Sequence, residues 1–193
     1  MAKKWTVVRL TSPPSLAVNV SEAKKHLRIS ETDVEQDDLI QSLVEAGIEK
    51  VQRDTGKQLV TCAFRQEGCS FGAAAVLGYG PVTRVTSVKY MDTAGNEQTL
   101  DPSVYEFDSG RQLVRTQYGE VFPEVADYPS AVKIEYVAGY GNDSGCIPRL
   151  FKNAVLLLAA QWFFDPAADV YASDANSNAY ERIIKTVMRA SYP

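Results

Sequence analysis

The stretch AVLLLAAQWFF, residues 154–164, constrains the fold of this chain more than any other feature. It is apolar around nearly its whole helical circumference, and Asp165-Pro166 ends it. Full burial of each large side chain contributes roughly 1.5 to 3 kcal/mol, so such a helix gains much more from being covered than from standing alone in water. We therefore expect it to lie in a core or in a contact between subunits. The packing residues are predicted to be Leu156, Leu157, Trp162 and Phe163.

Two more helices are predicted before residue 57. Ser21 is a candidate N-cap for a short helix, and Asp33 followed by Gln36 is a second start signal. Apolar residues then recur at three-and-four spacing between 39 and 51, and Gly56 is placed to end the pattern. The second helix is therefore expected to run for about 20 residues.

Between about residues 57 and 137 the apolar period changes from helical to two. Val60, Cys62 and Phe64 alternate with more polar neighbours, and stretches such as DTAGN, residues 92–96, are typical of tight turns. Antiparallel hairpins are expected here. The fold class is thus α+β: a helical bundle formed by residues 1–57 and 144–193, interrupted by an antiparallel β insertion at residues 58–143.

The last helical pattern is amphipathic and is expected to open at Asn178, with Glu181 three residues later. One side carries the cations Arg182, Lys185 and Arg189, and the other carries apolar residues that include Ile183, Ile184 and Val187. Such cations are commonly solvated, and their other uses are pairing with acids of a neighbouring protein or contacting phosphates.

Composition narrows the function classes. The formal net charge is −4, which argues against a protein that grips nucleic acid over a large surface. No apolar run is long enough to cross a bilayer, and MAKKWTVVRLTSPPS lacks the apolar core of a signal peptide, so we expect a soluble intracellular product. Three cysteines without a close pair indicate neither a disulfide framework nor a zinc knuckle.

Catalytic and cofactor motifs are not evident. VAGYGNDSGCIPRLF, residues 137–151, has the order of a phosphate-binding loop, but Gly145 is followed by Cys146-Ile147-Pro148, without the lysine and hydroxyl that such a loop needs. We interpret it as a flexible joint from sheet to helix. The single histidine, His26, is interpreted as structural, and no spacing predicts a metal site, a cofactor or a catalytic group.

Five phrases together resemble the head-tail connector (adaptor, head-completion) proteins of tailed double-stranded DNA bacteriophages. They are LTSPPSLAVNVSEAKKHLRIS, DDLIQSLVEAGIEKVQRDTGKQL, GPVTRVTSVKYMDTAGNEQTLDPSVYEFD, VKIEYVAGYG and IPRLFKNAVLLLAAQWFFDP, and they span almost the whole chain in order. The resemblance implies a non-enzymatic virion protein, made in the host bacterial cytoplasm and located in the neck between head and tail.

It further implies a ring, commonly of twelve copies, between the portal protein and the tail-completion or stopper protein. Double-stranded DNA would pass through its lumen without sequence-specific binding, and no membrane would be involved. By analogy, the helix and tail from Asn178 to Pro193 would dock on the portal through Arg182, Ile183, Ile184, Lys185, Val187 and Arg189.

Two other function classes stay open at this point. A small nucleic-acid-processing enzyme would require converging acids or a metal site. A β-rich binding or adhesion module would require an exposed aromatic cleft, for which the candidates are Tyr79, Tyr90, Tyr105, Tyr118 and Tyr128.

Overall fold

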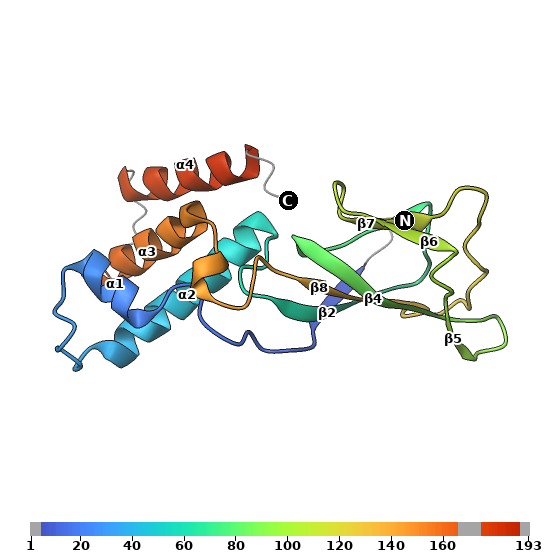
Figure 1. The fold of residues 1–193 in the computed structure, drawn as a ribbon, viewed down its shortest axis with the longest axis horizontal. Coiled ribbons are helices and arrows are strands. Elements are labelled where there is room, and N and C mark those ends of the chain that lie inside the picture. The colour runs from blue at the N-terminus through green and yellow to red at the C-terminus, as the bar shows by residue number, and fades with distance from the viewer. Residues whose placement is uncertain (1–4, 166–174, 190–193) are drawn as a thin grey trace. The chain divides into compact units, whose positions relative to one another are not determined.

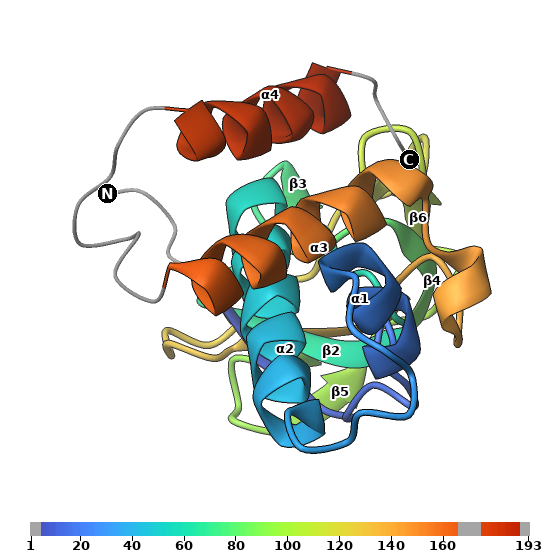
Figure 2. The ribbon, with the colours of Figure 1, turned by 90° about the vertical axis from the view of Figure 1, so that its left-hand side faces the viewer.

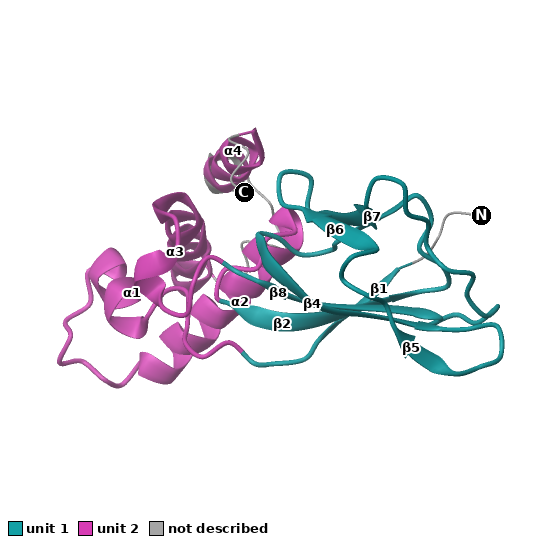
Figure 3. Ribbon diagram, turned by 45° about the vertical axis from the view of Figure 1, so that its right-hand side comes forward, with its two compact units in different colours: residues 1–12, 61–139, 193 teal, residues 13–60, 140–192 magenta. Residues whose placement is uncertain are grey.

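The computed structural model describes residues 5–165 and 175–189, with side chains from residue 179 onward in the second range. Helices and antiparallel strands both occur, which confirms the α+β class (Figure 1). The chain divides into a strand unit, residues 1–12 and 61–139, and a helical unit, residues 13–60 and 140–192 (Figure 3). The expected helical range began at residue 1 and differs here, because a strand at residues 6–9 pairs within the strand unit.

The strand unit holds two antiparallel sheets. One has the order β1-β2-β8-β4-β5 and the other the order β3-β7-β6. The strands are β1 (Thr6–Arg9), β2 (Cys62–Gly68), β3 (Ala74–Val76), β4 (Val82–Met91), β5 (Glu97–Thr99), β6 (Tyr105–Asp108), β7 (Leu113–Thr116) and β8 (Val132–Ala138). Strands distant in sequence are neighbours in the larger sheet, because β8 lies between β2 and β4.

Alternating burial explains why these segments form strands. Every second residue of β2 and of β8 is buried, which is the predicted period of two. Both sheets contribute to one apolar core, with Phe64 stacked between Tyr79 at 5.1 Å and Tyr136 at 5.6 Å between ring centroids. Gln66 is buried but satisfied, because its side-chain amide donates to the Val76 carbonyl at 2.7 Å and accepts a backbone hydrogen bond.

The helical unit contains α1 (Val20–Leu27), α2 (Asp37–Thr55), a 3-10 turn η1 (Ser144–Cys146), α3 (Arg149–Phe164) and α4 (Ala175–Arg189). Figures 1 and 2 show α3 lying between α4 and α1. The core joins all four helices and includes Ile40, Val44, Phe151 and Val155, each fully buried. This core is separate from that of the strand unit.

The ends of α1 and α2 only partly follow the predictions. Asn19 and not Ser21 caps α1: its extended backbone lets Oδ1 accept from the Glu22 amide at 2.7 Å, while Glu22 bonds the Asn19 amide in return. The second helix begins at Asp37, after a turn in which Asp33 Oδ1 accepts from the Glu35 amide. Its predicted end is confirmed, because Gly56 adopts a left-handed φ of 64° as the C-cap.

The α2–α3 contact depends on a glycine inside a helix. A Cβ atom at Gly47 would lie 3.3 Å from the Val155 carbonyl oxygen and 3.4 Å from its Cγ1. Because glycine has no side chain, the two helices can approach closely at this point. This close packing offsets the low helix propensity of glycine.

Candidate functional site

Helix α3 carries a continuous apolar face that the other residues described in the structure do not fully cover. Phe151, Ala154, Val155, Leu158 and Ala159 are buried in the helical core. Leu156, Leu157, Ala160, Phe163 and Phe164 follow one another at helical spacing on a different side of the helix. We call these five residues the α3 strip. Four are partly buried against the edge of the helical core and Phe164 is 71% exposed, so the described residues do not cover α3 on every side as we expected.

The four predicted packing residues of α3 lie on two different faces of the helix. Leu156, Leu157 and Phe163 belong to the α3 strip. Trp162 instead follows Leu158 by one helical turn, so it continues the row that faces the core, and it is partly buried there. The sequence identified an apolar helix but did not separate its two faces, because both carry the same residue types.

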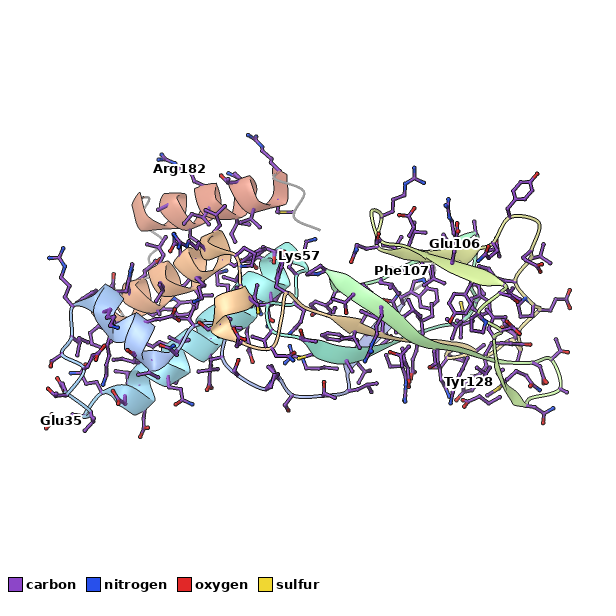
Figure 4. All side chains as sticks on the ribbon, in the orientation of Figure 1. Glu35, Lys57, Glu106, Phe107, Tyr128 and Arg182 are labelled. Atoms are coloured by element: carbon purple, nitrogen blue, oxygen red, sulfur yellow. The ribbon has the colours of Figure 1, made fainter. Side chains whose placement is uncertain are left out.

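Helix α4 begins at Ala175, one turn before the predicted start. Ile184 and Val187 are buried in the helical core, and Ile183 is partly buried against it. These apolar residues therefore hold α4 in its own unit, and portal docking stays a prediction. Arg182, Lys185 and Arg189 are exposed, and Arg182 points outward in Figure 4.

The charges on the outer face of α4 are only partly neutralised. Lys185 pairs with Glu181 at 3.2 Å, but both side chains are largely exposed, so the pair contributes little to stability. Arg182 and Arg189 make no ion pair with any described residue. The exposed face of α4 is therefore cationic.

A polar contact fixes the position of α4. The Tyr180 hydroxyl donates to Asp54 Oδ2 of α2 at 2.8 Å, and Lys50 reaches the same oxygen at 3.2 Å. Burial works to raise the pKa of Asp54, but these two hydrogen bonds outweigh it and hold the pKa below its usual value. Burial and the Asp54 charge raise the pKa of Tyr180 far above its usual value, so its hydroxyl keeps the proton it donates.

Glu22 connects three elements of the helical unit. One carboxylate oxygen accepts from Lys152 of α3 at 2.6 Å, and the other accepts from Ser144 of η1 at 3.1 Å. Lys152 also bonds Ser144 at 2.7 Å. Burial works to raise the pKa of Glu22, but the bonds from Lys152, the Asn19 amide and Ser144 lower it overall. Glu22, Ser144 and Lys152 are called the Glu22 node below.

Beside the Glu22 node lies an open hollow of about 630 Å³ between α1, η1 and α3. Four basic residues line it: Lys25 and His26 from α1, and Arg149 and Lys152 from α3. Ile147 and Leu156 add an apolar part. Sequence reasoning missed this site, because its two basic pairs are far apart in the chain and His26 was interpreted as structural. His26 is in fact exposed.

The glycine-rich segment before α3 was expected to be a flexible joint. It does connect β8 to α3, but hydrogen bonds hold it in place. Asp143 Oδ1 accepts from the Gly145 amide at 2.7 Å, and Ser15 Oγ donates to the Asn142 carbonyl at 2.9 Å. A Cβ atom at Gly141 would clash with the side chain of Cys146, so only glycine fits at this position of the turn. Ser144 anchors the segment to the Glu22 node.

Comparison with known proteins shows where this arrangement recurs. Residues 18–81, which include α1 and α2, match the family described as phage gp6-like head-tail connector protein. A solved structure, "Neck of empty GTA particle computed with C6 symmetry", superposes with a TM-score of 0.71 at 27% identity, covering 82% of this chain and 83% of that one. The chain is therefore similar to head-tail connector proteins in sequence over residues 18–81, and to a neck protein in fold over most of its length.

Two further structures are similar to this chain. "Virion of native gene transfer agent (GTA) particle" matches with a TM-score of 0.69 at 26% identity, covering 82% of this chain and 84% of that one. "Neck of native GTA particle computed with C12 symmetry" matches with a TM-score of 0.68 at 26% identity, covering 82% of each chain. No curated protein matches the chain significantly. Family and structures alike indicate a neck protein of a phage-like particle.

The aromatic candidates of the strand unit divide into two groups. Tyr79, Tyr90 and Tyr105 pack against its core, whereas Tyr118 and Tyr128 are exposed. Phe71 and Phe122 stack at 4.3 Å beside a hollow of about 370 Å³ formed by residues 70–72 and 122–125. The candidate tyrosines therefore do not converge on one cleft.

Among residues 5–165 and 175–189, no three His, Cys, Asp or Glu side chains are grouped to hold a metal ion. None of the helices in these ranges is long and apolar enough to span a membrane.

Proposed function

We propose that this chain is a head-tail connector, a non-enzymatic subunit of a closed ring in the virion neck, between the portal and the tail-completion or stopper protein. Twelve copies would surround a channel through which double-stranded DNA passes. The α3 strip carries the proposal, because it leaves an apolar face available to a neighbouring copy. The neck structures that were computed with C6 and C12 symmetry support a ring of this kind.

Ring closure requires two unlike surfaces on each subunit, since only a heterologous contact repeated by rotation generates a large ring. A stable contact of this type buries about 1,200 to 2,000 Å². The α3 strip would supply the apolar centre of one surface, with polar residues around it. The net charge of −4 suits passage of DNA, because a strongly cationic lumen would retain the polyanion.

The exposed cations of α4 are proposed to dock on the portal. Arg182, Lys185 and Arg189 would face acidic groups there, while Ile184 and Val187 keep α4 attached to its own core. Residues 190–193 lie outside the described residues, so only the helical part of the predicted docking segment is considered. The connector would be made in the bacterial cytoplasm and then incorporated into the particle.

The ring is tested by adding purified connector to portal-bearing heads and imaging them by negative stain. Wild type should add a ring of density at the portal vertex. Phe163→Ser with Phe164→Ser should prevent closure, whereas Val76→Ser, an exposed apolar change in the strand unit at 61% exposure, should not. Normal rings from the double variant would show that the copies meet elsewhere.

Portal docking needs a substitution and not a deletion, because removing α4 would also remove Tyr180, Ile184 and Val187 from the core. Arg182→Glu with Arg189→Glu should reduce binding to portal-bearing heads and leave the fold intact. Arg53→Glu, an exposed cation of α2, is the matched control. Equal head binding by both variants would contradict docking through α4.

A further inference from the structure

The hollow beside the Glu22 node has a surplus of positive charge. Its one acid, Glu22, is already engaged by Lys152 and Ser144. Lys25 pairs with Glu31 at 3.0 Å, but this contact is mostly exposed. His26 and Arg149 make no hydrogen bond or ion pair with any described residue. The rim of the hollow is therefore suited to a carboxylate or a phosphate.

The loop between α1 and α2 has the opposite character. Glu35 and Asp38 are exposed and make no ion pair with any described residue, and Figure 4 shows Glu35 at the tip of this loop. The same segment exposes two large apolar side chains, Val34 at 67% and Leu39 at 51%. Together with the first residues of α2, this segment combines unneutralised acids with uncovered apolar surface, and we call residues 33–39 the acidic loop.

The geometry points to the acidic loop of a second copy of this chain as the occupant of the hollow. Glu35 and Asp38 would pair with Arg149 and His26 at the rim, and Val34 would reach the apolar part formed by Ile147 and Leu156. This inference rests on the proposed ring and deepens it, because it names the second surface of the heterologous contact. Leu156 belongs to both the hollow and the α3 strip, so the two surfaces are continuous.

A nucleic acid phosphate is the competing occupant, and the charges favour the protein. Glu22 lies inside the hollow, and Glu31 lies next to Lys25 at its rim. A polyanion that spans the hollow would approach both carboxylates, whereas a short loop can place two acids beside Arg149 and His26 only. The apolar part also fits a side chain such as Val34 and gives a sugar-phosphate backbone nothing to contact.

The test uses the full-length connector and a fluorescent peptide of residues 32–39, TDVEQDDL, followed by anisotropy. Wild type should bind the peptide, and raised salt should weaken binding because charged pairs are screened. Arg149→Ala should weaken it by about two- to fivefold, since an exposed charged pair is lost. Arg53→Ala on α2 removes the same charge away from the hollow and should bind as wild type does. His26→Ala is the second variant, should Arg149→Ala not fold.

Three outcomes would overturn the inference: no binding of the peptide at its solubility limit, equal binding by the Arg149 and Arg53 variants, or unchanged binding of a peptide with Glu35→Gln and Asp38→Asn. Binding of a short DNA duplex that depends on Arg149 and displaces the peptide would also overturn it, in favour of a phosphate ligand. If rings formed on heads but the peptide did not bind, only the proposed contact between the acidic loop and the hollow would be refuted. If the peptide bound but no rings formed on heads, only the proposed function would be refuted.

Discussion

Replacing Tyr180 with Phe isolates the polar contact that holds α4. The change removes one hydroxyl, which donates to Asp54 at 2.8 Å, and leaves the buried ring in place. Hydrogen bonds to charged groups contribute about 1.5 to 3 kcal/mol. Because the Asp54 side chain is 29% exposed and keeps its contact with Lys50, solvent screening reduces this to about 1 kcal/mol.

The assay is hydrogen exchange of the α4 amides, residues 181–189, which reports local opening of this helix. A loss of about 1 kcal/mol should speed their exchange about fivefold. Tyr118→Phe is the matched control, because Tyr118 is fully exposed and makes no hydrogen bond with a described residue. If both variants exchanged like wild type, the contact would not contribute to α4 docking.

The hydrogen bond between Tyr180 and Asp54 also predicts how the stability of α4 docking depends on pH. The folded-state pKa of Asp54 lies below its usual value, so its contribution to stability is fully present above the unfolded pKa of about 3.9. That contribution is lost as pH falls through the folded pKa. The difference between wild type and Tyr180→Phe should therefore be constant near neutral pH and should narrow below about pH 4. A difference that widened on acidification would refute this assignment.

Two further substitutions test the helical unit by urea unfolding. Gly56→Ala should cost about 1 kcal/mol, because a side chain is strained at the left-handed φ of 64°, whereas Gly110→Ala, which has no such backbone, should change little. Similar effects of the two would remove the C-cap argument. Phe151→Ala should cost about 3 to 5 kcal/mol because Phe151 is fully buried. Phe164→Ala, at 71% exposure, should change the unfolding free energy by about 0.5 kcal/mol or less, and a comparable loss would mean that the α3 strip is covered within the chain.

Local patterns predicted the end of α2 but not the cap of α1. Gly56 was identified as the end of α2, because glycine adopts without strain the left-handed backbone that commonly ends a helix. The cap of α1 was assigned to Ser21, although Asn19 with Glu22 three residues later also has the capping-box pattern. Ser21 lies in the first turn instead and donates to Glu31 at 3.1 Å. Residue types alone did not distinguish Asn19 from Ser21 as the N-cap of α1.

The candidate sites depend on contacts between distant segments, which a single sequence does not reveal. Glu22 and Lys152 are 130 residues apart, and only the packing of α1 against α3 brings them together. The first strand, β1, was missed for a related reason. Its residues are mostly exposed and show no clear alternation, so its place in the sheet depends on pairing with β2.

The Glu22 node also sets a length requirement on the chain. One carboxylate is at once part of the cap of α1, the partner of the turn before α3 and the counter-ion of a lysine inside α3. Inserting or deleting a residue between positions 139 and 147 would shift Ser144 away from that carboxylate and leave α1 less well anchored. We therefore expect relatives with this arrangement to vary in the hairpins of the sheet while keeping this return segment at constant length.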